Sequence, residues 1–175
     1  MNKYFKNTRN CESALKLLFV RGILAVLMVG VGSVATYASD KVESYQSQEI
    51  TVYKSPQCGC CSKWVEHLEE SGFEVDVRTV NDTASVKQRV GVPSQFTSCH
   101  TAVVGDYWIE GHVPADLIQK LLAEHPDDIK GIAVPGMPMG SPGMEAPNPM
   151  EYEVLSVDKF GNVAVYAKRM GETDQ

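Results

Sequence analysis

Three cysteines stand almost side by side in the sequence Cys58-Gly59-Cys60-Cys61. Cys58 and Cys61 have the Cys-x-x-Cys spacing of a redox dithiol, and Cys60 adds a third thiol between them. A dithiol that exchanges disulfides needs one attacking and one resolving sulfur, so a third neighbour invites wrong pairings and crowds negative charge. A soft cation such as Cu(I) relieves this crowding by binding several thiolates. The cluster therefore favours Cu(I) binding as its first interpretation.

A fourth cysteine, Cys99, lies 38 residues beyond Cys61. Four other interpretations stay open for the set of four. They are two structural disulfides (such as Cys58–Cys61 with Cys60–Cys99), a closed zinc site, an iron–sulfur centre, and a metal-free dithiol reductase or isomerase. In the last of these Cys58 and Cys61 would be catalytic, with Cys58 as the attacking thiol by analogy.

Histidines and methionines near the cysteines extend the candidate ligand set. His100 follows Cys99 directly, although neighbouring side chains of a regular strand point to opposite faces. His112 lies beside Gly111, which would let the backbone bend toward the site. Thioethers are soft ligands that suit Cu(I), so the methionines of a Pro/Gly-rich stretch are candidates too. These are Met137, Met139 and Met144.

Hydrophobic periodicity and turn residues predict the elements that carry these side chains. Strands are predicted at 50–53, 73–80, 101–104 and 107–109, and helices at 60–71, 83–90 and from Pro114 to Pro126. Residues 131–150 are rich in Pro, Gly and Met and are predicted to form a loop or lid. The segments 152–157 and 162–167 alternate around a turn and predict a C-terminal hairpin.

This order predicts an α/β, thioredoxin-like fold with helices on a small mixed sheet. The cysteine cluster lies at the end of the first strand and the start of the first helix, where the helix dipole favours thiolate. In such a fold the turn Gly91-Val92-Pro93 is expected to lie against that helix start. We therefore expect Cys99 to lie close to the other three cysteines.

The chain of 175 residues has a net charge of −6, which suits one modest domain and argues against a nucleic-acid partner. Its first 38 residues have a basic start, a short apolar run and small residues at a possible cleavage site, which together predict a secretory signal peptide that includes Cys11. The predicted organisation is a signal peptide at 1–38, a polar leader at 39–49, the domain at 50–168 with its loop at 131–150 and hairpin at 151–168, and a tail at 169–175.

Four blocks in order resemble the CopG-type copper-resistance proteins, small exported proteins of Gram-negative bacteria. The blocks are Cys58-Gly-Cys-Cys61, Ser98-Cys-His-Thr101, Glu110-Gly-His-Val-Pro114, and Val134-Pro-Gly-Met-Pro138 with Gly140-Ser-Pro-Gly-Met144. The resemblance covers residues 50–168 and implies a thioredoxin-like fold, a periplasmic location and copper binding. Carried over by position, it implies the ligands Cys58, Cys60, Cys61 and Cys99.

The expected function is a periplasmic Cu(I)-binding protein that contributes to copper resistance, with one or more copper ions as its cofactor and a copper-linked thiol redox activity as an extension. The alternatives are a thiol–disulfide oxidoreductase and a zinc-stabilised binding module. Other periplasmic copper-handling or redox proteins are the expected partners. A membrane would be contacted only through an uncleaved signal peptide.

Overall fold

The computed structural model describes residues 49–173. The predicted signal peptide, Cys11 and nearly all of the predicted leader lie outside the described residues. Within the described part, no helix is long and apolar enough to cross a membrane.

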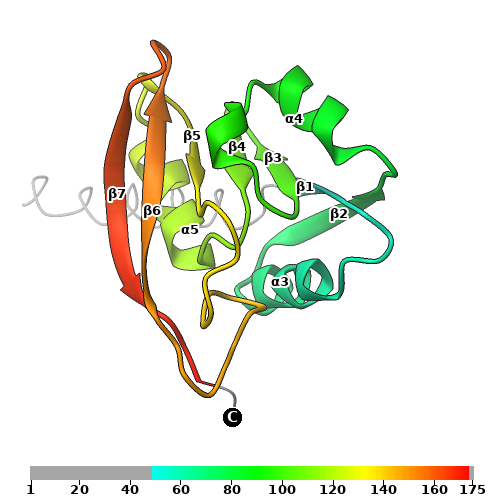
Figure 1. Ribbon diagram of the computed structural model, residues 1–175. Helices are drawn as coiled ribbons and strands as arrows, with labels where there is room; N and C mark the ends of the chain where they lie inside the picture. The colour runs from blue at the N-terminus through cyan, green and yellow to red at the C-terminus, as the bar shows by residue number, and fades with distance from the viewer. Residues whose placement is uncertain (1–48, 174–175) are drawn as a thin grey trace, which may run out of the picture. The chain divides into compact units, whose positions relative to one another are not determined.

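One seven-stranded mixed sheet organises the described chain, in the order β2-β1-β3-β4-β5-β6-β7 (Figure 1). The pairs β1–β2 and β4–β5 are parallel, and the other four neighbouring pairs are antiparallel. The strands are β1 (Glu49–Lys54), β2 (Glu74–Thr79), β3 (Thr101–Val104), β4 (Tyr107–Glu110), β5 (Ile129–Ala133), β6 (Glu151–Asp158) and β7 (Val163–Met170). The helices are α3 (Gly59–Glu70), α4 (Thr83–Val90), the short 3-10 helix η1 (Ser94–Phe96) and α5 (Ala115–Glu124).

Helices pack on both faces of this sheet. Ile109 of β4 belongs to the main core cluster, together with Trp64 and Leu68 of α3 and Ile118 of α5. The neighbouring residue in β4, Trp108, belongs to a second cluster with Val92, Phe96 and the end of α4. Because side chains alternate along a strand, α3 and α5 cover one face and the α4–η1 segment covers the other. Trp64 and Trp108 are both buried.

Local sequence signals explain where α4 begins and ends. Asp82 precedes α4 and accepts a hydrogen bond from the Ser85 amide at 3.1 Å, which satisfies one of the free N–H groups of the first turn. Gly91 ends the helix in the left-handed conformation, with φ 85°. This backbone geometry favours glycine because it lacks a Cβ.

The predicted mixed α/β fold is confirmed, and the observed order of elements follows the predicted one from β1 to α5. The C-terminal hairpin also forms, as β6 and β7. One prediction needs correction, because residues 131–133 belong to strand β5 and not to the loop. Gly131 lies so close to the Trp108 ring that an added Cβ would overlap it. A glycine inside the strand, followed by Pro/Gly-rich residues, makes this part of the sequence resemble a loop.

Candidate metal centre

The cysteine cluster lies where β1 turns into α3. Cys58 is the last residue before the helix and has an extended backbone, and its amide donates to the Ser55 carbonyl at 3.3 Å. Cys60 and Cys61 belong to the first turn of α3. The N–H groups of a first helical turn lack intrahelical partners and carry partial positive charge, so this position stabilises thiolate.

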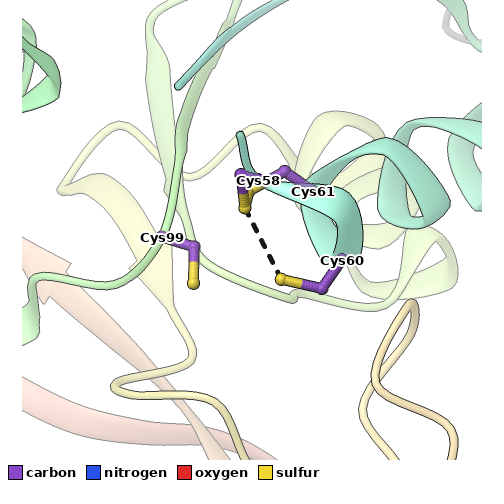
Figure 2. A group of neighbouring side chains, drawn as sticks. All are labelled: Cys58, Cys60, Cys61 and Cys99. Atoms are coloured by element: carbon purple, nitrogen blue, oxygen red, sulfur yellow. Dashed lines mark hydrogen bonds between the residues drawn. A yellow bond between two sulfur atoms is a disulfide. The ribbon is translucent and has the colours of Figure 1, made fainter. Parts of the chain in front are cut away.

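The structure brings all four predicted cysteines together. The sulfur atoms of Cys58, Cys60, Cys61 and Cys99 all lie within 4.8 Å of one another. Figure 2 shows Cys99 on the segment before β3, facing the start of α3 that carries the other three. Cys61 is fully buried and the other three are half-buried, so the site lies partly open at the surface. A group with this spacing can hold a metal ion.

Two of the four sulfurs form a disulfide. Cys58 and Cys61 are bonded, with their Cα atoms 5.3 Å apart, while Cys60 and Cys99 are free thiols. The Cys60 sulfur lies 3.5 Å from that of Cys58 (Figure 2). The structure thus contains the first disulfide of the two-disulfide interpretation, Cys58–Cys61, but not the second, Cys60–Cys99. Four thiols become available only after two electrons and two protons reduce the Cys58–Cys61 bond, and each binds metal as a thiolate once its proton has left.

The surroundings of Cys99 disfavour an isolated negative charge. Burial, together with the nearby Cys60 thiol, raises the pKa of Cys99 to about 11, and only Lys87 opposes this shift appreciably. A cation bound among the sulfurs would supply the missing positive charge and displace the proton. Several polarisable, partly buried sulfurs form a donor set that fits a soft monovalent metal such as Cu(I).

Cys99 reaches the cluster by a different route from the one the sequence suggested. Pro93 precedes η1, and its neighbours Val92 and Phe96 pack with Trp108 on the sheet face opposite to that of Trp64. The prediction that the Gly91–Pro93 turn lies against the helix start is therefore wrong. The segment between η1 and β3, which contains Cys99 itself, occupies that place.

His100 and His112 form a buried pair outside the group of four sulfurs. Both side chains are completely buried, and their ring centroids are 4.9 Å apart. The His100 ring also lies 4.3 Å from the Trp64 ring, and neither of its nitrogens has a hydrogen-bond partner. Nδ1 of His112 pairs with the Pro142 carbonyl at 2.9 Å, whereas its Nε2 has no partner. Burial lowers the pKa of both rings, so both are neutral at pH 7, and their role as ligands stays a prediction.

The Met-rich loop covers the first turn of α3. At Gly143 an added Cβ would lie 2.7 Å from the Cys60 carbonyl oxygen and 2.8 Å from the Trp64 amide nitrogen. Met144 is half-buried beside this contact, whereas Met137 and Met139 are exposed. The loop therefore approaches the cysteine site through its backbone, and methionine ligation stays a prediction.

Sequence reasoning missed a buried polar network behind Cys99. Glu110 is completely buried at the end of β4, where it pairs with Lys87 of α4 at 2.7 Å and with Thr101 of β3 at 2.6 Å. Its one signal in the sequence is an acidic residue directly after the strand predicted at 107–109. Lys87 is only 4% exposed. Nothing in the sequence marks it as buried, because a lysine on an amphipathic helix is ordinarily exposed.

Comparison with known proteins found one family model and two solved structures. The family model, described as a protein of unknown function, DUF411, matches residues 96–144. A structure named "Copper resistance protein copG- Form 2" is 43% identical, with a TM-score of 0.67, and the match covers 70% of this chain and 98% of that one. A second, named "Copper resistance protein copG- Form 1", is also 43% identical with a TM-score of 0.67, and covers 71% and 99% respectively. The search of curated proteins gave no match.

Proposed function

Because this chain belongs to the CopG family of copper resistance proteins, we propose that it is a periplasmic Cu(I)-binding protein that contributes to copper tolerance. The ligands in this proposal are the thiolates of Cys58, Cys60, Cys61 and Cys99. The observation that carries it is the convergence of these four sulfurs within 4.8 Å, from two segments far apart in the sequence.

The chemistry of the site favours Cu(I) over harder cations. Thiolates are soft ligands. Among the described residues, the group of side chains close enough to hold a metal ion consists of these four cysteines. The start of α3 favours negative charge on Cys58, Cys60 and Cys61, and each bound Cu(I) ion offsets the charge of one thiolate. Adjacent Cys60 and Cys61 are less suited to a single tetrahedral zinc ion, which needs four separated directions of approach.

The Cys58–Cys61 disulfide gives the proposed site a dependence on redox state. An external dithiol reduces the bond by exchange: the donor becomes a disulfide, and Cys58 and Cys61 become thiols. The reduced protein offers four sulfurs to copper, whereas the oxidised protein offers the two thiols of Cys60 and Cys99. Copper binding is therefore expected to follow reduction.

Anaerobic titration with Cu(I) against a chromophoric chelator tests this proposal. The reduced protein should take up at least one equivalent of copper, and the Cys60→Ser, Cys99→Ser double variant should bind it at least about 100-fold more weakly. Ser62→Ala, a neighbouring change on α3, is the matched control and should leave the affinity unchanged. Equal affinity in the double variant would disprove the proposed ligand set. Native mass spectrometry of the same samples identifies the metal, and one stoichiometric zinc ion would favour a zinc-stabilised module.

A second candidate function is that of a thiol–disulfide oxidoreductase, which the disulfide at Cys-x-x-Cys spacing supports. In this reaction Cys58 would attack a substrate disulfide and form a mixed disulfide, and Cys61 would then displace the substrate as a thiol. Insulin reduction that survives Cys60→Ser, combined with weak copper binding, would favour this candidate over the copper site.

The periplasmic location rests on the sequence of the N-terminal 38 residues, which lie outside the described part of the chain. Export should remove them by cleavage after Ala38. Expression of the full chain followed by cell fractionation should place the protein in the periplasmic fraction, and intact-mass analysis should show Ser39 as the new N-terminus. An uncleaved chain in the membrane fraction would contradict the proposed processing.

A further inference from the structure

A single carboxylate lies behind the Cys99 segment and touches both of its ends. Oε1 of Glu110 accepts a hydrogen bond from the Ser98 amide at 2.6 Å, and Oε2 accepts one from the Thr101 hydroxyl, also at 2.6 Å. Ser98 and Thr101 are the residues that flank Cys99 and His100 in the chain. Glu110 thus joins the beginning and the end of the four-residue segment that presents the Cys99 thiol.

Lys87 completes this arrangement from the opposite side. Its ammonium group lies 2.7 Å from Oε1 of Glu110 and 2.9 Å from the Thr101 hydroxyl, and its side chain is only 6% exposed. The lysine therefore neutralises the buried carboxylate and also holds Thr101. Without it the Glu110 charge would add to the negative charge of the nearby thiolates.

Stability alone gives a weak reason for an ion pair at this position. Removal of two charges from water is costly, and apolar pairs of similar volume are often at least as stable. What a carboxylate adds over an apolar side chain is directional acceptance of two hydrogen bonds from one segment. The geometry of those two bonds fixes the position of the segment rather than merely filling space.

We propose that Glu110, neutralised by Lys87, is a positioning residue that holds the Cys99 segment so that the Cys99 thiol stays within reach of Cys60. Gly111, the next residue, supports the same segment, because its amide donates to the His100 carbonyl at 3.1 Å. The consequence for copper affinity rests on the proposed copper function. The positioning itself does not, and it can be measured without metal.

The test uses the tendency of Cys60 and Cys99 to form a disulfide. In the full chain with Cys11, Cys58 and Cys61 changed to Ser, these two are the remaining thiols. Equilibration with glutathione, in which glutathione disulfide oxidises the pair and is itself reduced to two thiols, gives the effective concentration of one thiol at the other. Two double variants without the ion pair are compared in this background. One combines Lys87→Met with Glu110→Gln, and the other combines Lys87→Met with Glu110→Leu.

Glutamine keeps the hydrogen bonds and loses the charge, because its oxygen can accept from Ser98 and its amide can donate to Thr101. Leucine keeps the volume and loses both. We expect the glutamine variant to stay within about threefold of the parent and the leucine variant to fall about tenfold or more, the effect of one lost hydrogen bond to a charged group. Equal values in all three proteins, or an equal loss in both variants, would overturn the proposal.

Glu110→Asp keeps the experiment decisive if the leucine variant does not fold. It retains the charge opposite Lys87 but withdraws the carboxylate by one methylene, so it no longer reaches both Ser98 and Thr101, and the effective concentration should again fall about tenfold. An unchanged value in a folded Glu110→Asp protein would overturn the proposal. Cu(I) titration of the same substitutions in the wild-type cysteine background separates the two proposals: a parent that binds no copper disproves the copper function and leaves the positioning result intact.

Discussion

At the scale of single residues, Gly111 meets the strictest steric demand near the site. Its φ is 72°, and an added Cβ would lie 2.5 Å from the Val134 carbonyl oxygen and 2.6 Å from the Ser98 hydroxyl. Only glycine combines this backbone conformation with such close neighbours at low cost. The residue thereby lets β4, the loop after β5 and the Cys99 segment meet at one point.

Gly111→Ala should therefore destabilise the protein beyond the cost of its backbone conformation. Gly136→Ala is the matched control, because Gly136 has the same φ of 72° and nothing within 4 Å of an added Cβ. The control should lose about 1–2 kcal/mol from left-handed strain, and Gly111→Ala should lose about 1–3 kcal/mol more from overpacking. Urea denaturation of both variants measures the difference, and equal losses would contradict the steric account.

The sequence contains enough information to predict which cysteines meet, but not how they pair. The prediction that Cys99 joins Cys58, Cys60 and Cys61 is correct, although the expected route through the Gly91–Pro93 turn is not the one that the structure has. Which two sulfurs bond depends on distances of a few ångströms in the first helical turn, and the sequence offers several pairings. Burial of Lys87 and Glu110 was equally hidden, because it arises only when α4, β3 and β4 meet.

At the scale of elements, α3 supplies a cap for α5. Pro114 precedes α5 and offers no side-chain cap, but the Ala115 amide donates to Nε2 of His67 on α3 at 3.1 Å. The structure places His67 half-buried at this helix start. A cap supplied by another helix has no signature in the local sequence of α5, which explains why it was not predicted.

His67→Ala should lower the free energy of unfolding by about 1 kcal/mol, the typical value for loss of an N-terminal cap. Burial lowers the pKa of His67 below 6.5, against the opposing effect of nearby carboxylates. The unfolded chain therefore binds this proton first, and the stabilisation by His67 is present above about pH 6.5 and lost as the pH falls from there through the lower pKa of the folded protein. Urea denaturation from pH 7.5 to 5.5 should show a weaker pH dependence in His67→Gln, which can accept the hydrogen bond without titrating. Identical pH profiles would contradict this role.

The contact between the Met-rich loop and α3 depends on Gly143. Its φ is 81°, and an added Cβ would meet the backbone of Cys60 and Trp64. Gly143→Ala should therefore cost about 1–3 kcal/mol more than Gly161→Ala, which has a similar φ of 85° and open space around it. It should also speed alkylation of Cys60, because the loop has to move away from the first turn of α3. Unchanged alkylation and a cost equal to that of the control would show that the loop does not restrain the site.

Predictability at this scale follows the strength of local signals. Helices with clear caps and alternating strands are predicted within about two residues, the usual scatter at element ends, except that β7 continues to Met170, three residues beyond the predicted strand and into the predicted tail. Strand β5 was not, since Gly131 and the following Pro/Gly-rich residues resemble a loop. Its conformation comes from parallel pairing with β4 and antiparallel pairing with β6, both of which are contacts distant in the sequence.

At the scale of the whole molecule, the sheet joins a half formed by β1–β4 to a half formed by β5–β7 (Figure 1). The cysteine site lies in the first half, while the loop that covers it connects β5 to β6. The predicted C-terminal hairpin extends the sheet and anchors the far end of that loop. The Met150 amide donates to the Met139 carbonyl at 3.0 Å, and the Gly171 amide donates to the Met150 carbonyl, also at 3.0 Å. The sequence predicts the C-terminal hairpin, but the pairing of β5 with β6 depends on long-range contacts.

Copper should therefore stabilise the folded molecule mainly through Cys99. Cys58, Cys60 and Cys61 are adjacent in the sequence, so they also offer a site in the unfolded chain, whereas Cys99 joins them only after folding. With free Cu(I) buffered at 1,000 times the dissociation constant, the reduced protein should gain up to about 4 kcal/mol, reduced by whatever the unfolded chain binds. Cys99→Ser should lose most of this gain, while Ser62→Ala should keep it. Anaerobic thermal unfolding with and without copper measures both, and an equal rise in Tm for Cys99→Ser and the parent would show that Cys99 does not take part in binding.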